Sequence, residues 1–168
     1  MRCLLPILTL AASLAAQAPA PVADPFGPVR FLVGEWTGEG DGKPGSGSGA
    51  ASFRFELDGK VMVRRSHAEY PAANGRPASR HEDQMTIFAE GGLLKAFYVD
   101  NEGHVIRYLV APVAEGVAFT SEPAPGPRFR LTYLKKSEAL TALRFELAPP
   151  GKPEAFAPYL EATTRKVK

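Results

Sequence analysis

The sequence predicts an all-β fold: a single up-and-down antiparallel barrel of about ten strands with a short N-terminal helical plug. Short runs in which apolar and polar residues alternate recur along the chain, as in strands with one buried face. Turns rich in Gly and Pro separate these runs at close spacing, and no stretch shows the period of a long helix. A meander of this kind removes its exposed edges best by closing into a barrel.

The N-terminal residues that precede the barrel set the expected compartment. Residues 1–18 have the layout of a secretory signal peptide, with a positive start at Arg2, a short apolar run and then small residues. Residues 19–25 are predicted to be a disordered Pro/Ala spacer, and residues 26–168 the barrel domain. We therefore expect export to the periplasm or the extracellular space. Cys3 leaves with the signal peptide, so the mature domain has no disulfide and relies on its core.

The elements of the barrel domain follow in order. Residues 26–33 are expected to form a short helical turn that plugs one end. The predicted strands are residues 34–42, 53–57, 61–70, 81–89, 93–99, 104–111, 117–121, 128–133, 143–147 and 159–167. Asp58-Gly59 predicts a tight hairpin turn between the second and third strands. The Gly/Ser-rich residues 45–49 are expected to be a flexible hairpin connection, not a nucleophile elbow, because they do not lie at a strand-to-helix turn.

The first strand carries the most informative pattern of the chain. Successive side chains of a strand point to opposite faces. Here one face is polar, and the other carries Trp36 followed by Gly38, Gly40 and Gly42. Such glycines either let the strand bend as the barrel closes or leave room inside for a ligand. The sequence leaves both interpretations open.

Charge and composition exclude several classes of function. The formal net charge of +2 becomes +1 without Arg2, and the basic residues are scattered among acidic ones, so nucleic-acid binding is not expected. No second apolar segment is long enough to span a bilayer, and no stable membrane insertion is expected. The mature chain has no thiol for nucleophilic catalysis. Its histidines lack the close spacing of metal ligands, so no metal site is predicted.

A resemblance to the calycin barrels begins at Gly34-Glu35-Trp36. This segment resembles the Gly-x-Trp signature that opens those barrels, which include the lipocalins and the fatty-acid-binding proteins. In these families a basic residue of the last strand packs across the tryptophan and closes the end of the barrel. The resemblance assigns that role to Arg165, and cation–π attraction gives the contact a physical basis.

A more extensive resemblance is to nitrobindin-like proteins, which are ten-stranded haem-binding barrels. Residues 31–42 are similar to their opening segment, residues 74–77 followed by His81 to their Gly-x-Pro loop and next strand, and residues 158–162 to their Pro-His-Leu-x-Ala ending. Uncharacterised exported bacterial barrels of the calycin type share the opening and a Thr-Arg-Lys ending. The proximal haem ligand of nitrobindin-like proteins is the histidine of the last motif, and here that position is Tyr159. Because a tyrosinate can ligate ferric haem, Tyr159 is the iron candidate if haem binds; otherwise it is a residue of the barrel rim.

The function predicted from these observations is binding of a small, largely hydrophobic molecule inside the barrel, without a cofactor and without catalytic residues. One alternative, implied by the nitrobindin resemblance, is a haem protein that acts on peroxynitrite or nitric oxide. Another is a ligand-free structural or interaction domain of the cell envelope. The predicted ligand-binding residues are Trp36, Gly38, Gly40, His67, His81, Tyr98, Tyr108 and Tyr159.

Further aromatic residues are candidates for the lining of a pocket: Phe55, Phe97, Phe129, Tyr133 and Phe145. Among the histidines, His81 and Asp83 share a strand face with two apolar residues and are expected to point inward. His104 lies at a turn and is expected to be exposed to solvent.

Overall fold

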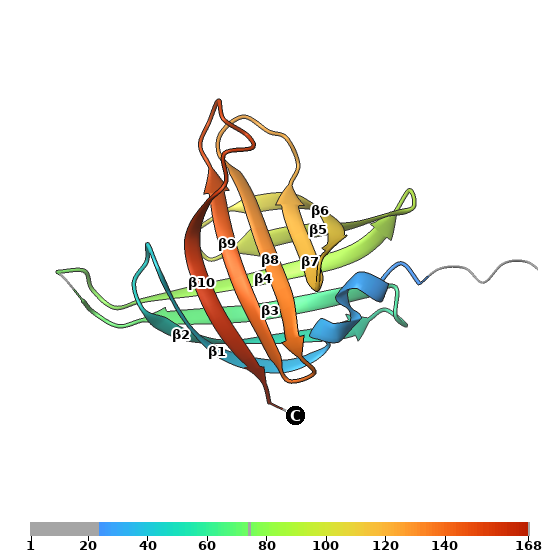
Figure 1. Cartoon of the computed structure of the whole chain (residues 1–168), viewed down its shortest axis with the longest axis horizontal. Helices are drawn as coiled ribbons and strands as arrows, with labels where there is room; N and C mark the ends of the chain where they lie inside the picture. Colours follow the sequence, from blue (N-terminus) through green and yellow to red (C-terminus); the bar gives the residue numbers. More distant parts are fainter. Residues whose placement is uncertain (1–23, 74, 168) are drawn as a thin grey trace, which may run out of the picture.

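The computed structural model describes residues 24–73 and 75–167. The predicted signal peptide and residues 19–23 of the predicted spacer lie outside the described residues. The described chain forms a closed barrel of ten antiparallel strands, in which β1 pairs with β10 and every other pair joins neighbours in sequence (Figure 1). The predicted fold class is confirmed. None of the described helical residues makes a segment long and apolar enough to cross a membrane.

The elements match the predicted order. They are η1 (Gly27–Leu32), a 3-10 helix, and the strands β1 (Gly34–Gly42), β2 (Gly47–Glu56), β3 (Val61–Tyr70), β4 (Ser79–Glu90), β5 (Leu93–Asp100), β6 (Val105–Val113), β7 (Gly116–Ser121), β8 (Arg128–Ser137), β9 (Leu140–Ala148) and β10 (Ala157–Lys166). In Figure 1, β8, β9 and β10 cross β2, β3 and β4 at a steep angle. The two sides of the barrel therefore face each other across a core of inward-pointing side chains.

The second strand differs most from its prediction. β2 begins at Gly47, so part of the predicted flexible Gly/Ser connection is strand, and Gly47 and Gly49 pair with Gly40 and Gly38 of β1. A Cβ atom on Gly38 would lie 2.7 Å from a backbone oxygen of β10, and one on Gly49 would lie 2.4 Å from a backbone oxygen of β3. These glycines thus allow neighbouring strands to approach closely. Gly38, Gly40, Gly47 and Gly49 also border a cavity inside the barrel, and that this space holds a ligand stays a prediction.

The 3-10 helix η1 covers one end of the barrel. Its Val29 and Leu32 are buried, as is Phe26 just before it. The indole Nε1 of Trp36 donates a hydrogen bond of 2.7 Å to the backbone oxygen of Leu32, which ties the plug to β1. Asp24, assigned by the sequence to the spacer, accepts a hydrogen bond from the backbone N–H of Phe26 and so belongs to this ordered end.

The basic residue that covers Trp36 is Lys166, and the prediction of Arg165 is wrong. The ammonium nitrogen of Lys166 lies 5.4 Å from the centre of the Trp36 ring. Arg165 is one position away, pairs with Thr37, and occupies the exposed outer face of β10. Gly34 has a φ of +130°, and a Cβ there would lie 2.6 Å from Lys166 Cε. The glycine of the Gly-x-Trp segment therefore leaves space for the lysine side chain.

Candidate functional site: a two-sided cavity inside the barrel

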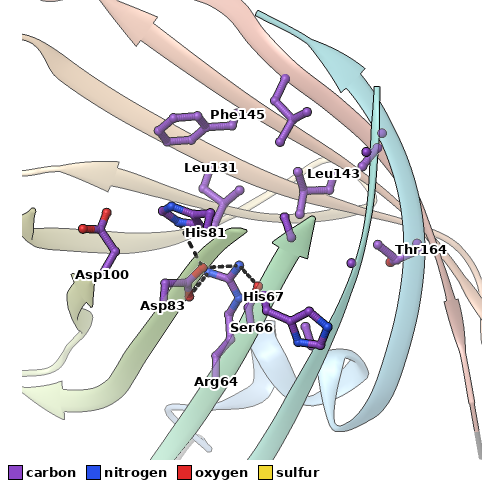
Figure 2. A pocket seen from close by; sticks show the side chains of 18 of the residues that line it. Arg64, Ser66, His67, His81, Asp83, Asp100, Leu131, Leu143, Phe145 and Thr164 are labelled. Carbon is purple, nitrogen blue, oxygen red and sulfur yellow. Dashed lines mark hydrogen bonds and ion pairs between the residues drawn. The ribbon is translucent and has the colours of Figure 1, made fainter. Parts of the chain in front are cut away.

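A cavity of about 370 Å³ occupies the interior of the barrel. It extends from Trp36, beside the η1 plug, to Tyr159 and Glu102 at the opposite end, where residues of the loops after β1 and β5 border the mouth. Strands β3, β4 and β5 supply a polar wall, and strands β8 and β9 supply an apolar one (Figure 2). The cavity is therefore amphipathic across its width.

The apolar wall follows from alternation in β8 and β9, which turns every second side chain inward. Phe129 and Leu131 come from β8, and Leu143 and Phe145 from β9. The rings of Phe129 and Phe145 are stacked at 6.0 Å with an interplanar angle of 4°. Phe145 also makes an edge-to-face contact of 6.0 Å with Tyr159 at the mouth.

A buried ion pair forms the centre of the polar wall. Arg64 of β3 and Asp83 of β4 both point inward, with side chains 8% and 4% exposed, and Arg64 Nη1 lies 3.2 Å from Asp83 Oδ1. Arg64 Nη2 donates a hydrogen bond of 3.0 Å to Ser66 Oγ. Burial alone disfavours the charge of a guanidinium, but the Asp83 carboxylate outweighs it and raises the pKa of Arg64. Arg64 is therefore a buried cation.

His81 extends the polar wall towards the mouth. Its Nε2 lies 3.0 Å from the hydroxyl of Tyr98, and its Nδ1 lies 3.0 Å from Glu102 Oε1. The Asp83 carboxylate, 3.6 Å from His81 Nε2, is the largest cause that raises the pKa of His81 to about 9; burial opposes the shift and Glu102 adds to it. His81 is thus a cation at neutral pH, and both of its ring nitrogens carry protons.

Asp100 is the second buried carboxylate of this wall, with a side chain 3% exposed. Burial opposes its ionisation, but hydrogen bonds from the backbone and side chain of His104 and from the Tyr98 hydroxyl lower the pKa of Asp100. Burial, together with the carboxylates of Asp83 and Asp100, raises the pKa of Tyr98, so its phenol keeps its proton. Along the wall, cations and carboxylates alternate.

Several buried polar atoms of this cavity lack a hydrogen-bond partner. Among the described residues they are Arg64 Nε, Asp83 Oδ1 and the hydroxyl of Tyr133, and all three side chains border the cavity. Asp83 Oδ1 is close to the guanidinium but is not aligned for a hydrogen bond. Burial raises the pKa of Tyr133 to about 12, so its hydroxyl keeps its hydrogen. The cavity therefore has hydrogen-bonding capacity that the protein itself leaves unused, from Arg64 and Asp83 on the polar wall and from Tyr133 on β8.

The structure places all of the predicted ligand-binding residues at the border of this cavity. His67 borders the cavity, but it alternates with the inward-pointing Ser66 and Ala68, so its side chain belongs to the outer face of β3. Tyr159 lies at the mouth and is 37% exposed. Whether these residues bind a ligand stays a prediction.

The further aromatic candidates divide between the cavity and other places. Phe129, Tyr133 and Phe145 border the cavity. The prediction for Phe97 is wrong, because Leu94, Ala96 and Tyr98 take the inward positions of β5. Phe97 faces outward, with the Arg107 guanidinium 5.6 Å from its ring. Phe55 packs edge-on at 5.3 Å against Phe26, in the plug and not along the cavity.

Sequence reasoning missed Arg64, Ser66, Asp100 and Glu102 as parts of the site. One signal was available, because an inward Asp83 among apolar residues needs a buried cation as its partner. The alternation in β3 that makes Met62 and Tyr70 inward also makes Arg64 and Ser66 inward. Which cation this is follows only from the register of β3 with β4. That register sets Ser66 opposite Asp83, and Arg64 lies two residues from Ser66 on the same face.

Neither the inward-pointing His81 nor Tyr159 is arranged as a ligand for haem iron. Both ring nitrogens of His81 carry protons and have partners, so this side chain has no lone pair for iron. Tyr159 is partly exposed at the mouth, and in the described residues no cationic side chain bonds to its phenol. Nor do the described residues bring together three or more side chains that suit a metal ion.

The protonation of His81 predicts a loss of stability at high pH. The pKa of His81 in the folded state, about 9, lies above the ordinary 6.5. Its contribution to the free energy of unfolding is therefore fully present below pH 6.5 and is lost as the pH rises through 9. We expect urea unfolding to show a decrease of about 3 kcal/mol between pH 6.5 and pH 9.5 that is absent in His81→Gln. His67→Gln, the same change on the outer face of β3, should retain the wild-type decrease. Equal pH dependence in wild type and His81→Gln would contradict this assignment.

The architecture agrees with the calycin resemblance at the level of the barrel alone. A closed barrel of ten antiparallel strands, with one end covered by a short helix, is consistent with a calycin-like fold. Comparison with protein-family models and with curated proteins finds no match for this chain. Membership of a particular calycin family therefore stays a prediction.

Proposed function

We propose that this chain binds a small, largely apolar molecule inside the barrel. The observation that carries the proposal is the cavity of about 370 Å³ with one apolar wall. Its size falls within the range of about 300–1,000 Å³ typical of small-molecule sites. A barrel that serves only as a scaffold is expected to fill its interior with side chains, as small barrels do.

The arrangement of the walls supports a ligand with an apolar body. Phe129, Leu131 and Leu143 offer a continuous hydrophobic surface, and each Å² of apolar ligand surface removed from water contributes about 25 cal/mol. The charged groups of β3, β4 and β5 lie on the opposite wall, where they can orient a ligand, and the Tyr133 hydroxyl of β8 adds one polar group. Sites of this composition, mostly apolar with a few fixed polar groups, are the general pattern for small-molecule binding.

The experiment that tests this proposal uses the neutral fluorophore N-phenyl-1-naphthylamine and the purified barrel domain. Trp36 is the only tryptophan and borders the cavity, so binding should change its fluorescence as well as that of the probe. Ala68→Phe places a ring in the cavity beside the glycine face and should weaken binding by about tenfold or more. Ala111→Phe, the same change at an exposed position of β6, should bind like wild type.

Two outcomes of this experiment count against an interior site. One is that wild type does not bind the probe or any other apolar molecule tried with it. The other is that Ala68→Phe, shown to be folded by circular dichroism, binds as tightly as Ala111→Phe. In the second case the probe binds to the outer surface.

A further inference from the structure

We propose that the molecule held in the cavity carries an uncharged polar group that both donates and accepts hydrogen bonds, such as a hydroxyl or a primary amide, and that the polar wall discriminates against carboxylates and amines. This inference rests on the proposed function, because it concerns the chemistry of the ligand of the same cavity. It is carried by the balance of charges in the wall and by the atoms that lack partners.

The buried part of the polar wall is electrically neutral. Arg64 and His81 are cations, and Asp83 and Asp100 are carboxylates; their side chains are between 3% and 27% exposed. Each cation lies against a carboxylate, since Asp83 contacts both Arg64 and His81. Glu102, the remaining carboxylate that contacts His81, is 57% exposed at the mouth and is screened by water.

A charged ligand would disturb this balance. A carboxylate beside Arg64 would add a third negative charge to a buried wall whose cations are already paired. An ammonium group would add a third positive charge next to the same guanidinium. In either case a charge is transferred from water into the protein without an available counter-ion, which is strongly unfavourable.

The unpartnered atoms suit a neutral group of mixed character. Tyr133 offers a hydroxyl hydrogen, and Arg64 offers its Nε–H, so a ligand oxygen has donors available. Asp83 Oδ1 offers an acceptor for a ligand O–H or N–H. An alcohol or a primary amide can use donors and acceptor at once, whereas a carboxylate uses only donors and an ammonium only the acceptor. Figure 2 shows Asp83 and Arg64 side by side in this wall.

The test compares ligands that differ only in the polar group: 1-decanol, decanoate and decylammonium, each competing with N-phenyl-1-naphthylamine at pH 7.5. We expect 1-decanol to displace the probe at a concentration at least about tenfold lower than either charged compound. Decanoate or decylammonium that binds as tightly as 1-decanol overturns the inference but leaves the proposed function intact. Failure of the probe and all three compounds to bind overturns both.

Charge variants separate this electrostatic selection from simple partitioning of neutral molecules. Asp83→Asn removes one buried negative charge, so the ratio of decanoate to decanol dissociation constants should fall by about tenfold. Glu82→Gln removes a negative charge from the neighbouring, exposed position of β4 and should keep the wild-type ratio. An unchanged ratio in a folded Asp83→Asn protein overturns the inference. If Asp83→Asn does not fold, the wild-type ranking of the three compounds still decides.

Discussion

Replacing Arg64 with alanine is expected to destabilise the folded protein by about 3–5 kcal/mol, because it leaves the buried Asp83 carboxylate without its closest cation. Asp83 is 4% exposed, and the side chain that would remain near it is His81 at 3.6 Å. The substitution also removes the hydrogen bond to Ser66 and opens space in the wall. Urea unfolding at pH 7.5, followed by circular dichroism, measures the change.

The control for this prediction removes both charges. Arg64→Met with Asp83→Leu replaces the ion pair by apolar side chains of similar size, and buried pairs replaced in this way cost little. We expect the double variant to lie within about 2 kcal/mol of wild type and to be more stable than Arg64→Ala alone. If Arg64→Ala unfolds at the same urea concentration as wild type, the ion pair is not buried in solution.

The barrel could be predicted from the sequence because each strand is identified by a pattern within its own residues. Alternation along β8 and β9 and the turn residues between β2 and β3 require no knowledge of distant contacts. The start of β2 could not be predicted in this way, since Gly47 and Gly49 have little intrinsic preference for a strand. They are in β2 because β1 and β3 approach on either side, which is a property of the closed barrel.

The polar wall could be predicted only in part. The inward position of His81 follows from its spacing to Met85 and Ile87 within one strand. The partnership of Arg64 with Asp83 depends on how β3 is aligned with β4, and a shift of one residue would turn Arg64 outward. The beginning of β3 is apolar on both faces, so its local pattern does not fix that alignment.

Replacing Trp36 with alanine is expected to cost about 3–5 kcal/mol, the usual range for removing a large buried aromatic side chain. The indole is 3% exposed, holds the plug through its hydrogen bond to Leu32, and lies under the Lys166 ammonium.

Lys166→Met keeps the contact without the charge and should cost no more than about 1 kcal/mol, which separates the cation–π attraction from packing. Thermal unfolding followed by circular dichroism measures both variants, since Trp36→Ala removes the only tryptophan. A loss below about 1 kcal/mol for Trp36→Ala would show that η1 and Trp36 do not hold the closed end together. Because the cavity begins at Trp36, the same variant should also weaken binding of the neutral probe, whereas Lys166→Met should not.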